Sequence, residues 1–164
     1  MSNKIKREKE LIQQIESAFA DSVRPRDDEL VVNPEYDKAD KFIQDFKGKT
    51  WQDVTLEILY HRRLQLPLFT AQAFRYFLPA FLIVPLRSSS DSKYNPDEIS
   101  EHVFYSLISP AGKFIWTLKL KDIISGLSAE QKLAVTNFIQ YFLEKNPQIA
   151  ALYADQVKTF WNIE

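Results

Sequence analysis

The sequence of 164 residues contains no cysteine, three glycines and two histidines. Without cysteine the chain has no disulfide bond, no thiolate metal site and no cysteine nucleophile. Three isolated glycines cannot form a glycine-rich phosphate loop, and their scarcity disfavours a β-rich fold full of tight turns. A zinc site needs three or four ligands, more than two histidines supply. We therefore expect no cofactor, no metal ion and no catalytic set of residues.

Net charge is also nearly absent, since 21 basic residues are balanced by 22 acidic ones. This balance does not steer the whole chain to nucleic acid or to an anionic membrane.

The first ten residues, MSNKIKREKE, lack the apolar segment of a signal peptide, so we expect a cytoplasmic protein. No serine lies in a GxSxG motif, and the sequence favours a non-catalytic protein without excluding an enzyme.

A phenylalanine-rich stretch over residues 64–86 stands at the centre of the chain. Arg75 and three prolines interrupt it, which favours a buried segment over a membrane span. Thr70 is a suitable N-cap, and apolar residues occupy every face of the helix predicted over 71–86. Pro79 lacks a backbone donor, so this helix either kinks there or ends and starts again. We predict that it is buried.

Amphipathic patterns and capping residues predict further helices on both sides of the centre. Asn-Pro pairs beginning at 33, 95 and 146 and a Ser128–Gln131 capping box are typical helix starts, and Gly48 is a fitting stop. The segment 103–120 allows either helix or a short β-hairpin, because its apolar and polar residues alternate. The other predicted helices cover residues 3–20, 34–46, 50–63, 96–107 and 147–161, and one follows Ser128.

The chain as a whole is expected to form a single globular domain over residues 1–164. We predict a mainly α fold, an orthogonal multi-helix bundle around the buried central helix. Residues 1–30 would supply an N-terminal helix and loop, and residues 33–161 the core. A chain of this length buries about two-thirds of its unfolded surface, which is enough for a core without disulfides or metals.

Residues 61–82, HRRLQLPLFTAQAFRYFLPAFL, resemble the signature of an uncharacterised family of small bacterial proteins. The shared pattern is H-x5-P-L-x-T-x2-A-F-R-Y-F-L-P-A-F-L. Two flanking pieces, FKGKTWQDV and LSAEQKLAVTNFIQYFLE, are similar too, so the likeness spans residues 46–144 and is poorest between 87 and 126. The resemblance implies a compact domain and adds no mechanism.

Four residues near the centre are candidates for binding an anionic ligand. His61, Arg62 and Arg63 form the densest positive cluster outside the N-terminus, and Arg75 lies in an apolar setting beside Pro79. A buried guanidinium needs a carboxylate, carbonyls or water. For Arg75 the alternative to a ligand is therefore a structural ion pair.

Three functions remain open on this basis. A non-catalytic interaction or regulatory module fits the many aromatic residues and implies a protein partner or self-association. A small-molecule binding protein or enzyme would use Arg75 to hold an anionic ligand. Nucleic-acid binding through the basic N-terminal helix and residues 61–63 is the weakest of the three, because the net charge is balanced. We favour the first and expect no membrane association.

Overall fold

The structure, a computed structural model, describes residues 2–109 and 114–164. Within these residues the fold consists of nine α-helices and three short 3₁₀-helices without a β-strand, so the mainly α prediction is confirmed. Contacts divide the chain into two compact units. Unit 1 comprises Met1–Ala20 and Phe104–Glu164, and unit 2 comprises Asp21–Val103. The single-domain organisation expected from the sequence stays a prediction.

Unit 2 is built around α4 (Ala71–Arg87), the helix predicted at the centre of the chain. Most of its side chains are buried, as expected. Thr70 caps it, since its hydroxyl accepts a hydrogen bond from the main-chain N–H of Ala73 at 3.1 Å. The helix continues through Pro79, so this proline does not end it. The other elements are η1 (Asp27–Glu29), α2 (Ala39–Phe46), η2 (Trp51–Asp53), α3 (Leu56–Arg62), η3 (Leu66–Leu68) and the start of α5 (Pro96–Ile108).

Phenylalanine rings from α2, α4 and the segment before α4 form the core of unit 2. The Phe69 ring centroid lies 4.7 Å from that of Phe42 and 4.9 Å from that of Phe46. Phe77 of α4 stacks on Phe69 at 5.5 Å and lies 4.9 Å from Phe46. All four side chains are buried. Aromatic pairs at such distances stabilise beyond the burial of their area, so this cluster holds α2 against α4.

Two helices predicted in unit 2 have different bounds. The amide oxygen of Asn33 accepts from the N–H of Glu35 at 3.1 Å, and the residues that follow form turns before α2 begins at Ala39. Such a side-chain bond is compatible with a turn as well as with a helix start, and here turns follow it. The helix predicted over 50–63 is interrupted at Val54, which is extended, and Thr55 then caps α3.

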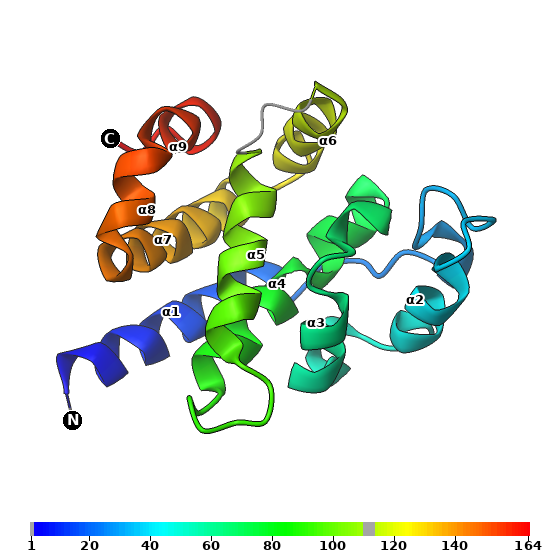
Figure 1. The fold of residues 1–164 in the computed structure, drawn as a ribbon, viewed down its shortest axis with the longest axis horizontal. Helices are drawn as coiled ribbons and strands as arrows, with labels where there is room; N and C mark the ends of the chain where they lie inside the picture. Colours follow the sequence, from blue (N-terminus) through cyan, green and yellow to red (C-terminus); the bar gives the residue numbers. More distant parts are fainter. Residues whose placement is uncertain (1, 110–113) are drawn as a thin grey trace. The chain divides into compact units, whose positions relative to one another are not determined.

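Unit 1 combines segments from both ends of the chain. Its helix α1 (Asn3–Phe19) packs alongside α7 (Ala129–Lys145) (Figure 1). The capping box predicted at the start of α7 is confirmed, because Gln131 N–H donates to the Ser128 hydroxyl at 3.1 Å and Ser128 N–H donates to the Gln131 side chain at 3.0 Å. The remaining elements are the end of α5, α6 (Phe114–Ser125), α8 (Pro147–Leu152) and α9 (Ala154–Trp161).

Residues 103–108 and 114–120 are helical, so the β-hairpin left open at 103–120 does not form in the described residues. The first segment belongs to α5. Just before this helix, the side-chain oxygen of Asn95 accepts a hydrogen bond from the N–H of Asp97 at 3.0 Å. The second belongs to α6, and the Trp116 indole donates to the Ser106 carbonyl at 3.0 Å. Helix capping and this tertiary bond outweigh the alternating pattern. Residues 110–113, between these two helices, lie outside the described residues.

Candidate functional site

His61–Arg63, three of the four predicted ligand-binding residues, lie at the C-terminal end of α3. The Arg62 guanidinium donates from Nε to Asp45 at 2.6 Å and from Nη1 to the Gln65 side chain at 2.9 Å. Only 16% of its side chain is exposed. Arg62 therefore connects α3 with α2 and offers little free charge to an external anion.

Arg63 is held in a similar way by the end of α3 and the start of α5. Its guanidinium lies 3.9 Å from the ring centroid of Tyr60 and donates to the Tyr60 carbonyl at 2.6 Å. Nη2 is 3.2 Å from a carboxylate oxygen of Glu98, and 19% of the side chain is exposed. The remaining donor, Nε, is buried without a hydrogen-bond partner. The stacked ring and the carboxylate together explain why this cation is tolerated there.

His61 is the accessible member of the cluster, with 54% of its side chain exposed. Its Nε2 lies 3.9 Å from a carboxylate oxygen of Glu57, which also accepts a hydrogen bond from the Tyr94 hydroxyl at 2.9 Å. The His61 and Tyr94 rings are 5.3 Å apart. These contacts join α3 to the segment that precedes α5.

Arg75, the fourth candidate, lies half-buried on α4, a helix that packs against α3. It takes part in a contact within the protein. Because Pro79 has no N–H, the Arg75 carbonyl lacks the usual helical donor four residues later. Ligand binding by these four residues stays a prediction, and each of them also has a contact within the protein.

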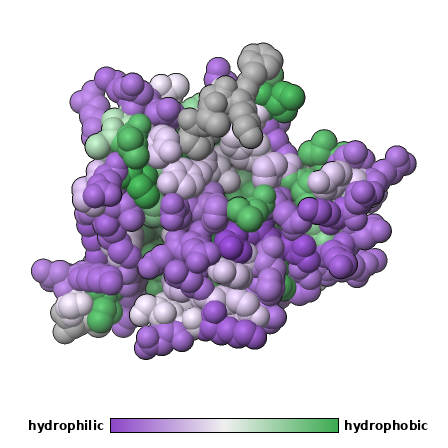
Figure 2. Space-filling view, in the orientation of Figure 1, coloured by the Kyte–Doolittle hydropathy of each residue, from purple (hydrophilic) through white to green (hydrophobic). Residues whose placement is uncertain are grey.

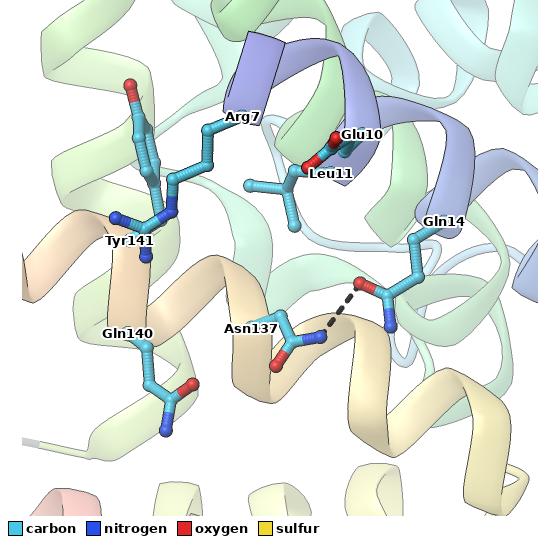
Figure 3. Close-up of a pocket in the computed structure, with 7 residues that line it drawn as sticks. All are labelled: Arg7, Glu10, Leu11, Gln14, Asn137, Gln140 and Tyr141. Carbon is cyan, nitrogen blue, oxygen red and sulfur yellow. Dashed lines mark hydrogen bonds between the residues drawn. The ribbon is translucent and has the colours of Figure 1, made fainter. Parts of the chain in front are cut away.

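A groove of about 360 Å³ runs between α1 and α7 in unit 1. Most of its lining residues are polar or charged, and the Gln14 and Asn137 side chains point toward each other (Figure 3). A hydrogen bond crosses it, since Asn137 Nδ2 donates to Gln14 Oε1 at 2.9 Å. The lining residues are Arg7, Glu10, Leu11 and Gln14 from α1 and Asn137, Gln140 and Tyr141 from α7.

The charged groups beside this groove are paired with one another. Arg7 donates through both terminal nitrogens to Glu144, with one contact at 2.9 Å, and its guanidinium lies 5.2 Å from the Tyr141 ring centroid. The Tyr141 hydroxyl donates to Glu8. The hydrogen bonds from Arg7 hold the pKa of Glu144 below its usual range. These pairs hold α1 to α7 and leave little net charge for a ligand.

A larger groove, of about 860 Å³, lies among α7, α8, α9 and the residues that follow α9; we call it the α7–α9 groove. It combines an apolar lining with a charged one. The apolar lining consists of Leu143, Pro147, Ala150, Ala154, Val157 and Ile163. The charged lining consists of Glu144, Asp155, Lys158 and Glu164, next to the amide of Gln140.

Local signals and tertiary contacts shape this groove. The Asn146 side chain donates to the Phe142 carbonyl at 2.8 Å where α7 ends, and Pro147 then starts α8. The helix predicted over 147–161 breaks at Tyr153, so α8 and α9 are separate helices. The Trp161 indole donates to the Leu107 carbonyl at 2.7 Å and holds α9 against α5.

The sequence reasoning identified neither groove. On α7, Asn137 bonds to α1, while Gln140 and Glu144 line grooves. A usable signal was the small residues Pro147 and Ala150, three positions apart at the start of a predicted helix. Side chains at that spacing share a helix face, and small ones leave room for a neighbouring molecule.

The visible face of the molecule is mostly hydrophilic, with small separate hydrophobic groups (Figure 2). Among residues 2–109 and 114–164, no helix combines the length and hydropathy that crossing a bilayer requires. The same residues contain no cluster of three or more His, Cys, Asp or Glu side chains that could bind a metal ion.

These features define an all-helical protein whose grooves, in the described part of the chain, lie between neighbouring helices at the surface. Comparison with family profiles identifies the group within this class. The profile of a family of unknown function, DUF6714, matches residues 7–164, so the chain belongs to that family. This confirms the resemblance to an uncharacterised family. Neither the curated proteins nor the solved structures compared with the chain provide a match.

Proposed function

We propose that this protein is a non-catalytic interaction module and that its α7–α9 groove holds a helical segment of a protein partner. The observation that carries this proposal is the lining of the groove, in which apolar side chains lie beside charged ones. Partner helices that bind in grooves bury one apolar face and keep their polar flanks at the edge. The cytoplasmic location expected from the sequence is part of the proposal.

The size and side chains of the groove support a helix as the occupant. Its volume of about 860 Å³ lies toward the upper end of the range for binding sites, roughly 300–1,000 Å³. Ala150 and Ala154 add little bulk, so a backbone can approach them closely. Val157 also lines the groove, is largely buried and supplies an apolar contact. An amphipathic helix fits such a surface with side chains spaced three and four residues apart.

Alternatives that use residues 61–63 receive less support. Arg62 and Arg63 already have carboxylate partners at 2.6 and 3.2 Å. An anionic ligand or a phosphate backbone would have to displace Asp45 or Glu98, and breaking a half-buried ion pair costs more than forming a new exposed one.

A pair of matched variants tests the proposal. Ala154 is exposed and lines the groove, whereas Ala151 is exposed on α8 and does not belong to the lining. Ala154→Trp fills the groove, and Ala151→Trp adds the same side chain outside it. We expect the wild-type protein and Ala151→Trp to retain the same partner from a native lysate, and Ala154→Trp to retain about tenfold less.

Circular dichroism and light scattering accompany this comparison. Unchanged helicity in both variants would show that the loss is local, and light scattering would reveal whether the wild type forms a dimer that Ala154→Trp, but not Ala151→Trp, dissociates. Equal retention of every partner by the two variants would refute the proposal.

A further inference from the structure

The charges around the α7–α9 groove are mainly negative. Three carboxylates and one ammonium group lie beside its apolar lining. The carboxylates belong to Glu144, Asp155 and Glu164, and the ammonium group belongs to Lys158. All four residues are exposed, so their side chains can turn toward a molecule in the groove.

Two of these carboxylates have intramolecular partners. Glu144 accepts from both terminal nitrogens of Arg7, in the pair that joins α1 to α7, so it stays with Arg7. Glu164 lies 3.6 Å from the ammonium group of Lys158, and both side chains are more than half exposed. A single exposed ion pair contributes little to stability, so Glu164 can exchange its partner at low cost. Asp155 forms no ion pair within the described residues and is available directly.

We infer that the segment held by the α7–α9 groove is a basic amphipathic helix, with an apolar stripe flanked by lysine or arginine. This inference rests on the proposed function and specifies its partner. The apolar stripe covers the side chains that include Ala150, Ala154 and Val157, and the flanking cations meet Asp155 and Glu164. An acidic helix would instead place carboxylates beside carboxylates, which opposes binding.

A defined peptide probes this inference without knowledge of the natural partner. The probe is a labelled peptide of about 18 residues, five helical turns, with leucine on one face and lysine on its flanks. Its counterpart carries glutamate at every lysine position. Fluorescence anisotropy measures the binding of both to the wild-type protein, and light scattering records the oligomeric state.

We expect the lysine peptide to bind at least about tenfold more tightly than the glutamate peptide, and to weaken as salt rises from about 50 to about 300 mM. Asp155→Asn combined with Glu164→Gln should weaken it by about two- to thirtyfold, the range for two exposed ion pairs. Glu35→Gln combined with Asp37→Asn makes the same change in net charge at exposed positions of unit 2 and should have little effect.

The outcomes separate this inference from the proposed function. If the lysine peptide fails to bind, if the glutamate peptide binds as well, or if both double variants behave alike, the inference is wrong. The same holds if light scattering shows a dimer that Ala154→Trp, but not Ala151→Trp, dissociates. The proposed function stands in each of these cases as long as Ala154→Trp, but not Ala151→Trp, removes partner binding. Loss of that difference refutes the function itself.

Discussion

Replacing Thr70 by valine tests whether one hydroxyl joins the start of α4 to the segment around η1. The hydroxyl accepts from the N–H of Ala73 at 3.1 Å and donates to the carbonyl of Glu29 at 2.7 Å. The Thr70 N–H also donates to the Leu30 carbonyl at 2.9 Å. Valine keeps the branched shape and the backbone bond and removes both hydroxyl bonds.

The expected loss follows from these two bonds. Removing an N-cap costs about 1 kcal/mol. Removing the donor to the Glu29 carbonyl costs about 1 kcal/mol more. The sum, about 2 kcal/mol, is a large share of the roughly 5–15 kcal/mol by which proteins are stable. With a urea dependence of about 2 kcal/mol per molar, the midpoint of unfolding should fall by about 1 M.

Urea unfolding followed by circular dichroism measures this loss, with two controls. Thr70→Ser keeps the hydroxyl and should recover more than half of the lost stability. Thr55→Val removes the cap of α3, where the hydroxyl accepts from the N–H of Ile58 at 3.3 Å without a second hydrogen bond among the described residues, so about 1 kcal/mol is expected. If Thr70→Val and Thr70→Ser have equal midpoints, the hydroxyl does not make the contribution assigned to it.

Two further predictions concern one residue in each unit. Gly48 has a φ of +70°, and a Cβ there would meet no atom within 4 Å. Gly48→Ala should therefore lower the free energy of unfolding by about 1–2 kcal/mol through backbone strain alone, and Gly48→Asn should lower it less. Urea unfolding measures both. Burial lowers the pKa of Lys119 to about 8. After methylation with ¹³C-formaldehyde, one lysine signal, absent in Lys119→Arg, should titrate near pH 8, and its titration near pH 10 would contradict this. Because the folded chain releases this proton before the unfolded chain does, the contribution of Lys119 to stability should rise between about pH 8 and 10.5.

Local signals explain why several elements were predictable from the sequence. Thr70 and Ser128 cap α4 and α7 because a hydroxyl and a backbone N–H three residues apart meet wherever a helix begins. Because α4 is apolar on every face, it is expected to be buried whichever elements pack against it. The start predicted for the helix after Asn33 was wrong for a related reason. An asparagine side chain bonds to the backbone in a turn as readily as at a helix start.

The grooves and the partners of the arginines were not predictable in this way. Arg62 reaches Asp45 across 17 residues, and Gln14 reaches Asn137 across 123 residues. No pattern within one helix specifies such a partner, because it depends on how the helices pack. The break at Tyr153 divides a segment whose composition suits a continuous helix, and the α7–α9 groove depends on that break.

The pairing of α1 with α7 also has a consequence for synthesis on the ribosome. At about 5–20 residues per second, roughly 6–25 s pass between the addition of Gln14 and that of Asn137, 123 residues later. During that time the apolar side of α1, with Leu11, Ile15 and Phe19, has no α7 to cover it. Unit 2 is continuous in sequence and fully synthesised before α7, so the nascent α1 is the segment that we expect chaperones to bind.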